Sequence, residues 1–195
     1  MRKAIKHLQA ADPILSGIIE RVGAYRLKFS QPNFESLVQS IVSQQVSGRV
    51  AQVIFGRLLA AVPEGLTPQN ILALRPAKMR RLGLSKQKTT YIRDLARHTR
   101  DGTVDFAALA DLADTEVIER LTKVKGIGVW TAHMFLIFSL RRTNVLPSGD
   151  FGIRTAIRKA YALEQLPKPD EIEKIAQGWH PYCTVAAWYL WRSLE

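Results

Sequence analysis

Cysteine is nearly absent from this sequence of 195 residues, since Cys183 is the only one. A single thiol excludes an internal disulfide and any zinc or iron–sulfur site built from several cysteines, and it fits a reducing compartment. Long apolar runs are also missing, because the longest, Met134 to Phe138, is far too short to span a bilayer. The charged N-terminus lacks the apolar segment of a signal peptide. We therefore expect a cytoplasmic, nucleoid-associated protein, or a nuclear one in a eukaryote, without membrane contact.

Acidic residues are scarce relative to basic ones. The chain has 17 Asp and Glu against 28 Lys and Arg, which gives a formal net charge of +11. Such a surplus favours polyanionic partners, because each phosphate that a protein neutralises releases condensed counterions. No continuous Lys/Arg block marks a lipid-binding tract. With 47% apolar residues, the chain can form one compact domain or two small lobes around a shared core.

Strand-like alternation is missing too, and signals for helix starts recur instead. Apolar residues fall at helical spacing along the whole chain, which predicts an all-α fold of about ten short helices. The first is expected from about Asp12 to Val22, with Gly23 as its cap. Proline follows a cap or turn residue at four places, and each predicts a helix start: Asp12-Pro13, Thr67-Pro68, Arg75-Pro76 and His180-Pro181.

Two polar or charged segments allow more than one interpretation. The junction Ser43 to Ser47 contains two glutamines between apolar helices. Ser47 is expected to cap the second helix, and the junction could simply satisfy backbone groups. The basic segment from Ala77 to Arg100 is either a solvated helix face or a surface for a polyanion. Within it, Ser85 is expected to cap a helix that runs to His98.

A glycine turn, Val124-Lys125-Gly126-Ile127-Gly128, separates two expected helices. The first helix should run from Asp114 to about Thr122 and the second from about Val129 to Leu140. Two glycines let the backbone turn tightly while Ile127 packs into the core. The amides of Gly126, Gly128 and Val129 would then face outward at a helix N-terminus, which favours an anion. In so basic a chain this predicts a helix-hairpin-helix, residues 121–140, that grips a DNA phosphate without reading sequence.

The segment LTKVKGIGVWTAHMF, followed by LPSGD, resembles the helix-hairpin-helix (HhH-GPD) DNA glycosylase superfamily, and within it the 3-methyladenine DNA glycosylase II branch. The similarity extends to FESLVQSIVSQQVSGRVA, LGLSKQKTTYIRDLA and WHPYCTVAAWYLW, and so covers nearly the whole chain from Ala11 onward. It implies a single domain, 1–195, of two packed helical subdomains with an active-site cleft between them. One lobe would span approximately 32–140, and the other approximately 1–31 plus 141–195.

The resemblance assigns the catalytic role to Asp150. Considered alone, an aspartate before Phe151-Gly152 is typical of a helix cap, and the two roles are compatible. An alkylated purine already carries positive charge, so its departure needs no general acid, and one carboxylate suffices where ordinary glycosidases need two. Asp150 would stabilise the oxocarbenium-like sugar and position or deprotonate the attacking water.

Trp130 predicts the type of product. In the family's bifunctional members a lysine two residues after the GxG turn attacks the sugar, whereas this chain has tryptophan there. An indole cannot form a Schiff base, so we expect a monofunctional enzyme without abasic-lyase activity. Lys125, the nearest lysine, is expected to meet a phosphate.

The resemblance also implies a base pocket, a DNA surface and a cation site. The flipped base would enter a pocket lined by Trp130, Tyr182, Trp188 and Met134, the last at a position where relatives often have tyrosine. Trp188 and Trp191 also fit a helical core, and Cys183 replaces an arginine common in the family. Gln45 is expected to fill the gap left by the base. The DNA-contacting set is Gln44, Gln45, Ser47, Lys125, Gly126, Gly128, Val129 and Thr131. The carbonyls of Thr122, Val124 and Ile127 match those that hold Na⁺ or K⁺ in relatives, and no other cofactor is expected.

These observations together predict a monomeric, monofunctional DNA glycosylase that removes 3-methyladenine or 7-methylguanine from double-stranded DNA by base flipping. Three alternatives remain open. The chain could act on deaminated or oxidised bases, or it could be a non-enzymatic helix-hairpin-helix protein that binds distorted DNA. It could also be a basic helical scaffold with a coincidental glycine turn, whose DNA binding would depend steeply on salt.

Overall fold

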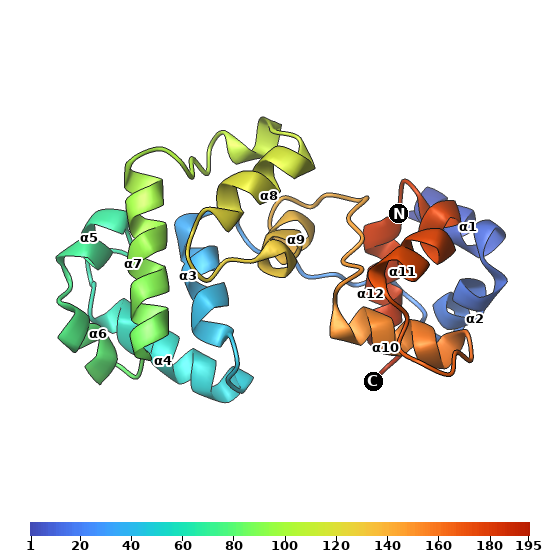
Figure 1. Ribbon diagram of the computed structural model, residues 1–195, viewed down its shortest axis with the longest axis horizontal. Coiled ribbons are helices and arrows are strands. Elements are labelled where there is room, and N and C mark those ends of the chain that lie inside the picture. Colours follow the sequence, from blue (N-terminus) through green and yellow to red (C-terminus); the bar gives the residue numbers. More distant parts are fainter. The chain divides into compact units, whose positions relative to one another are not determined.

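The computed structural model describes residues 1–195 and consists of twelve α-helices and two short 3₁₀-helices, without a strand (Figure 1). The predicted all-α fold is therefore confirmed. The chain divides into two compact units. We call Ser30–Phe135 the continuous unit, and Met1–Phe29 together with Leu136–Glu195 the discontinuous unit. No helix has the length and apolarity needed to cross a bilayer.

The continuous unit is built around α7, which packs against α3 and α5. Its core is formed by fully buried side chains such as Ile41, Ile71 and Leu95. Capping side chains set several helix starts, since Ser85 accepts the Lys88 amide at 3.1 Å, as the sequence predicts. The elements are α3 (Phe34–Ser43), α4 (Gly48–Ala60), α5 (Pro68–Ala73), α6 (Pro76–Arg81), α7 (Lys86–Arg100), the 3₁₀-helix η1 (Leu109–Asp111), α8 (Asp114–Thr122) and most of α9 (Val129–Phe138).

The discontinuous unit packs α12 against α2 and α10. Asp12 joins its parts, because one carboxylate oxygen accepts the Leu15 amide at 2.9 Å and the other accepts the Trp179 indole N–H at 2.9 Å and the Tyr161 hydroxyl. These donors offset hydration that the carboxylate loses on burial. The elements are α1 (Arg2–Ala11), α2 (Pro13–Val22), α10 (Phe151–Ala160), α11 (Pro169–Ile175), the 3₁₀-helix η2 (Ala176–Trp179) and α12 (Cys183–Arg192).

Two sequence expectations about helix starts are wrong. The helix expected from about Asp12 to Val22 is present as α2 but is not the first, because α1 precedes it, with Ala4 and Leu8 buried one turn apart while Arg2, Lys3 and Lys6 are exposed. The start expected at His180-Pro181 lies later, since α12 begins at Cys183. Tyr182 precedes it with φ −123° and ψ 28°, outside the helical region. The other three proline positions are confirmed as helix starts.

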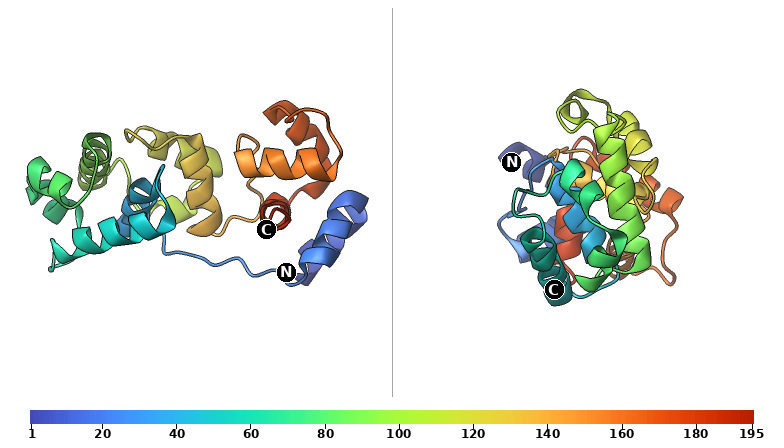
Figure 2. Two further views of the ribbon diagram at one scale, coloured as in Figure 1. Left: turned by 90° about the horizontal axis from the view of Figure 1, so that it is seen from below. Right: turned by 90° about the vertical axis from the view of Figure 1, so that its left-hand side faces the viewer.

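The connection from α2 to α3 contains no helix and runs as an extended segment (Figure 2). It starts at Gly23, whose φ of +79° ends α2 as the sequence predicts. It finishes at Asn33, whose side chain accepts the Ser36 amide at 3.0 Å and caps α3.

Candidate nucleic-acid interface and active site

The turn between α8 and α9 is anchored by two apolar side chains. Val124 is 1% exposed and Ile127 is 3% exposed, so the prediction that Ile127 packs into the core is confirmed. The Ile127 amide donates to the Val124 carbonyl at 3.1 Å, which closes the turn. Gly126 adopts a φ of +83°, the left-handed region that favours glycine.

The two glycines of the turn have different roles. A β-carbon added to Gly126 would lie 2.1 Å from Cδ2 of Tyr91, so the ring of this α7 residue occupies the space that any side chain would need. A β-carbon on Gly128 would meet nothing within 4 Å, and its φ is not positive. The expectation that both glycines are needed for the tight turn therefore holds for Gly126 alone.

Backbone amides at the turn face in two directions. The Lys125 amide donates inward to Oδ2 of Asp94 at 2.9 Å, and the Ile127 amide also points inward. Gly126, Gly128 and Val129 are exposed, and no acceptor within the chain takes their amide protons. Because the Gly128 carbonyl accepts the Ala132 amide at 3.0 Å, these amides lie at the N-terminus of α9. Such a group of donors suits an anion.

A cleft of about 570 Å³ in the continuous unit brings several predicted DNA-binding residues together. The Gln44 side chain crosses this region and donates to the Gly126 carbonyl at 3.0 Å, so the glutamine junction and the hairpin are directly linked. Five predicted residues line the cleft: Gln44, Gln45, Gly126, Trp130 and Thr131. Six other lining residues are not in the predicted DNA-contacting set or base pocket: Ser40, Ser43, Ser85, Gln87, Lys88 and Tyr91.

Gln45 stands at the corner between α3 and α4 with a φ of 55°, and it is exposed. A positive φ is uncommon for a residue other than glycine and costs conformational energy. The next helix is capped by Ser47, whose hydroxyl accepts the Val50 amide at 3.4 Å, as the sequence predicts. The helices on both sides therefore fix the backbone at Gln45, and its exposed side chain extends from a rigid corner.

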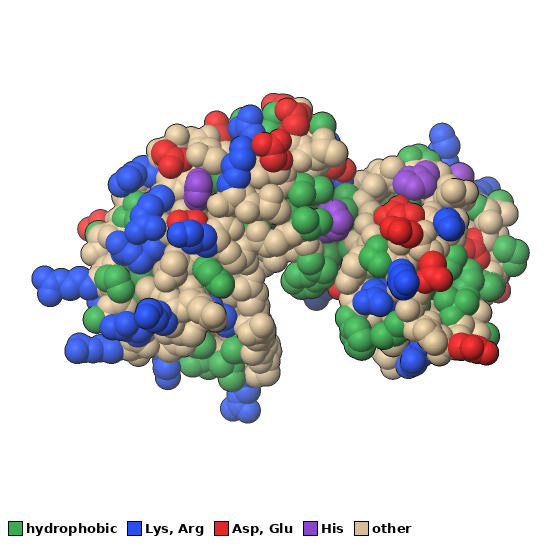
Figure 3. Space-filling model, in the orientation of Figure 1, with side chains coloured by type: hydrophobic (Ala, Val, Ile, Leu, Met, Phe, Trp, Pro, Cys, Tyr) green, Lys and Arg blue, Asp and Glu red, His purple; other side chains and the backbone are tan.

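The basic segment of α6 and α7 contains both half-buried cations, which donate to backbone carbonyls, and exposed cations. Lys88 donates to the Val42 carbonyl at the end of α3 at 2.7 Å, and burial lowers the pKa of its ammonium group. Arg93 donates to the carbonyls of Leu72 and Leu74, at 3.1 and 2.7 Å, and so caps the end of α5. Figure 3 shows many Lys and Arg side chains on the continuous unit. The remaining cations of the basic segment are exposed: Lys78, Arg80, Arg81, Lys86, Arg97 and Arg100.

Asp150 is the N-cap of α10, as the sequence predicts. Its Oδ1 accepts the Ile153 amide at 2.8 Å and the Trp191 indole N–H at 2.8 Å, and the residue is 9% exposed. Gly152 leaves room for this arrangement, because a β-carbon there would lie 3.0 Å from Oδ1 of Asp150 and 3.1 Å from Cδ1 of Trp191. Two donors on one oxygen fix the orientation of the carboxylate.

Trp191 is the functional candidate that the sequence did not reveal. Its spacing from Trp188 is typical of a helical core, yet its ring is half-buried, stacks on Phe138 with centroids 6.0 Å apart, and bonds to Asp150. The sequence offered one general indication, because a tryptophan that is partly buried needs a hydrogen-bond acceptor for its indole N–H. The sequence does not say which acceptor that is.

The expected base-pocket residues are distributed over both units. Trp130 and Met134 lie on α9 in the continuous unit, where Trp130 is 50% exposed. Trp188 is 8% exposed in the core of the discontinuous unit, with its ring centroid 4.7 Å from that of Tyr25. Tyr182 directly precedes α12, and its ring lies edge-on to His7 with centroids 5.3 Å apart. Within its own unit, Asp150 therefore has Trp191 as its aromatic partner.

Metal-binding groups of the usual kind are absent. No cluster of three or more His, Cys, Asp or Glu side chains could hold a metal ion. Cys183 is fully buried, and burial raises the pKa of its thiol to about 12, so the thiolate needed for metal binding or nucleophilic attack is disfavoured. The hairpin offers only neutral carbonyl oxygens, of which that of Val124 already accepts the Ile127 amide.

The hairpin, the cleft and the surroundings of Asp150 are consistent with comparisons with known proteins. Residues 38–181 match the model of the HhH-GPD superfamily of base excision DNA repair proteins. DNA-3-methyladenine glycosylase 1 of Schizosaccharomyces pombe is 35% identical over 199 residues, which cover 99% of this chain and 87% of that protein. The structure of S. pombe 3-methyladenine DNA glycosylase Mag1 in complex with abasic DNA has a TM-score of 0.86 at 35% identity, with 97% of this chain and 95% of that chain covered. DNA-3-methyladenine glycosidase from Bacillus halodurans has a TM-score of 0.88 at 38% identity, with 96% and 87% covered.

Proposed function

We infer that this chain, which belongs to the HhH-GPD superfamily of base excision DNA repair proteins, is a DNA glycosylase that removes alkylated purines from double-stranded DNA. The relatives described above, named for 3-methyladenine excision, support this assignment. The observation that carries it is the geometry of Asp150, a carboxylate held by the Ile153 amide and the Trp191 indole. A carboxylate held in this way is preorganised to face a developing positive charge.

The reaction replaces the bond from the base to the sugar C1′ by a bond to water. The electron pair of the breaking bond leaves with the base, and a cationic alkylated purine departs as a neutral molecule. Positive charge then develops on the sugar, where the Asp150 carboxylate stabilises it and orients a water molecule. Water adds at C1′ and its proton passes to Asp150 or to solvent, which leaves an abasic site.

The hairpin and the cleft account for how the DNA would be held. The amides of Gly126, Gly128 and Val129 would donate hydrogen bonds to a phosphate at the N-terminus of α9, since they are exposed and find no acceptor within the chain. Gln45, presented from its strained corner, would fill the space left by the flipped base. The exposed Trp130 would stack on that base, and its attraction to a cationic ring favours an alkylated purine.

Trp130 also sets the product that we expect. It stands at the family's lysine position, and an indole cannot attack the sugar to form a Schiff base. The neighbouring Lys125 is exposed and belongs to the phosphate-binding turn. The enzyme should therefore leave an intact strand with an abasic site.

A monovalent cation would fit the chemistry of the hairpin. The carbonyls of Thr122, Val124 and Ile127 are neutral oxygen donors, which suit Na⁺ or K⁺ better than a metal that prefers thiolate or imidazole. The Val124 carbonyl accepts one N–H and retains a second lone pair. When bound, the cation would add positive charge beside the phosphate-binding amides.

The direct test is release of 3-methyladenine and 7-methylguanine from methylated DNA by the purified protein and by Asp150→Asn. The amide can still accept the two hydrogen bonds but carries no charge, so we expect excision to fall at least about 100-fold with little change in folding. Equal release by both proteins would refute the role of Asp150.

Two further measurements separate the alternatives. A duplex that carries hypoxanthine or an oxidised purine, in competition with methylated DNA, tests whether neutral lesions are preferred. Binding to distorted DNA without an abasic product would instead identify a non-enzymatic helix-hairpin-helix protein.

A further inference from the structure

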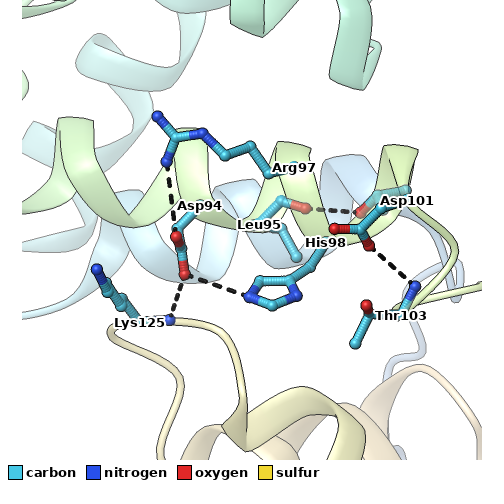
Figure 4. Close-up of polar contacts among 8 residues, drawn as sticks. Asp94, Leu95, Arg97, His98, Asp101, Thr103 and Lys125 are labelled. Carbon is cyan, nitrogen blue, oxygen red and sulfur yellow. Dashed lines mark hydrogen bonds and ion pairs between the residues drawn. The ribbon is translucent and has the colours of Figure 1, made fainter.

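The inner side of the hairpin turn is held by side chains from outside the hairpin. Tyr91 of α7 packs its ring beneath Gly126, and Gln44 donates to the Gly126 carbonyl. Asp94, close to Tyr91 along α7, accepts the Lys125 amide (Figure 4). The phosphate-binding turn is therefore shaped from α7 and from the end of α3 as well as by its own glycines.

Of the three side chains that contact the inner side of the turn, that of Asp94 is the charged one. It is 8% exposed, and its Oδ2 lies 2.9 Å from the Lys125 amide and 3.6 Å from Nε2 of His98. Its Oδ1 lies 3.6 Å from Nη1 of Arg97. A carboxylate loses hydration free energy when it is buried, so it is retained at such a place only with good partners. Here one of those partners is a backbone amide 31 residues away in sequence.

The direction of the Lys125 amide determines what the rest of the turn presents. With the Lys125 and Ile127 amides turned inward, those of Gly126, Gly128 and Val129 are the ones left without an acceptor within the chain. If Asp94 were absent, the Lys125 amide would need a new acceptor, and the Val124–Lys125 peptide would lose the hydrogen bond that fixes its orientation. The outward amides would then lose the fixed arrangement that a phosphate requires.

We propose that Asp94 is a positioning residue for DNA binding, which orients the hairpin turn through the Lys125 amide so that the outward amides meet a phosphate. This inference rests on the proposed function, which assigns the hairpin to the DNA backbone. Asp94 belongs to the continuous unit and Asp150 to the discontinuous unit. Because Asp94 acts through the hairpin turn, we expect its loss to change the affinity for DNA and not the excision rate at saturating protein.

Three variants test the proposal. Asp94→Ala removes the acceptor, and Asp94→Asn keeps an oxygen for the Lys125 amide. Asp101→Ala is the matched control, because it removes the same charge from the end of the same helix, where Asp101 is exposed and accepts the Thr103 amide. Any general effect of net charge on DNA affinity is therefore common to Asp94→Ala and Asp101→Ala.

The first readout is the affinity for a duplex that contains a tetrahydrofuran abasic analogue. We expect Asp94→Ala to bind about tenfold more weakly, the loss of one hydrogen bond to a charged group, and Asp94→Asn to stay within about threefold of wild type. Asp101→Ala should bind as wild type does. At saturating protein, the single-turnover excision rate of Asp94→Ala should equal that of wild type. Wild-type affinity in a folded Asp94→Ala protein would overturn the proposal.

The second readout is hydrogen exchange of the Lys125 amide, measured by NMR in the free protein. Exchange should be slow in wild type and Asp94→Asn and fast in Asp94→Ala. If Asp94→Ala does not fold, Asp94→Asn provides the test. Tenfold weaker binding by Asp94→Asn, with the Lys125 amide still protected from exchange, would overturn the proposal. It would show that the charge of Asp94, and not the orientation of the Lys125 amide, determines the affinity. Neither readout requires excision. Failure of wild type to release methylated bases would therefore refute the proposed function, while unchanged binding by Asp94→Ala would refute this inference alone.

Discussion

The indole N–H of Trp191 donates to Oδ1 of Asp150 at 2.8 Å, and the two residues come from different helices. Asp150 caps the start of α10, whereas Trp191 lies in the last turn of α12. The same oxygen accepts the Ile153 amide. The orientation of the proposed catalytic carboxylate thus depends on the packing of α12 as well as on its own helix.

Replacement of Trp191 by phenylalanine should slow excision while DNA affinity is retained. The substitution keeps a ring to stack on Phe138 but removes the N–H donor. A hydrogen bond to a charged group contributes about 1.5–3 kcal/mol, so we expect a fall of at least about tenfold in the single-turnover rate. The control is the same substitution in the Asp150→Asn background, where it should have little further effect because both changes act on one carboxylate. Full additivity of the two losses would argue against a role through Asp150.

The two glycines of the hairpin should differ sharply when each is replaced by alanine. Gly126→Ala places a methyl group against the Tyr91 ring at a φ of +83°, and we expect a loss of about 2–4 kcal/mol in the free energy of unfolding. Gly128→Ala meets open space and should change this free energy by less than about 0.5 kcal/mol. Urea unfolding of both variants provides the measurement. Equal losses would show that the Tyr91 ring moves aside.

Lys88 should contribute to stability, unlike its neighbour Lys86. Lys88→Met removes the hydrogen bond to the Val42 carbonyl, and we expect a loss of about 1–2 kcal/mol in the free energy of unfolding. Lys86→Met removes the same charge from an exposed site at the start of α7 and should stay within about 0.5 kcal/mol of wild type. Denaturation midpoints of the two variants distinguish a lysine that holds the end of α3 from a solvated one. Two equal midpoints would contradict this stabilising role of Lys88.

Stability should fall at alkaline pH through Tyr25. Burial, and secondarily the neighbouring Tyr189, raise the pKa of Tyr25 to about 12, whereas an unfolded tyrosine titrates near about 10. Between about pH 10 and 12 the folded state therefore binds more protons than the unfolded state, and stability decreases as pH rises. In Tyr25→Phe this decrease should be shallower. Urea midpoints measured across this range test it, and identical slopes for the two proteins would be evidence against the effect.

Features that act within a few residues of sequence were predictable. The caps at Asp12, Ser47, Ser85 and Asp150 follow from one side chain and an amide two or three positions later. The buried Ile127 and the tight turn at Gly126 follow from equally local patterns. Such interactions have the same geometry in any fold, so the residue type and its position suffice.

Interactions across the fold were not predictable. The bonds from Trp191 to Asp150, from Lys125 to Asp94 and from Lys88 to Val42 span 41, 31 and 46 residues. Each depends on how helices pack, and a single sequence does not encode that in a local pattern. The helix α1 was missed for a related reason, because only Ala4 and Leu8 of its ten residues are buried.

The division of the chain has a consequence for biosynthesis. The continuous unit, Ser30–Phe135, is a single stretch that can complete its core as soon as it leaves the ribosome. The discontinuous unit cannot, because α2 packs on α12, and Leu15 and Ile18 must remain without that partner until nearly the whole chain has been synthesised. The hairpin should therefore form during translation before the surroundings of Asp150 do. During that interval the nascent chain exposes the apolar face of α2, which is the kind of surface that chaperones bind.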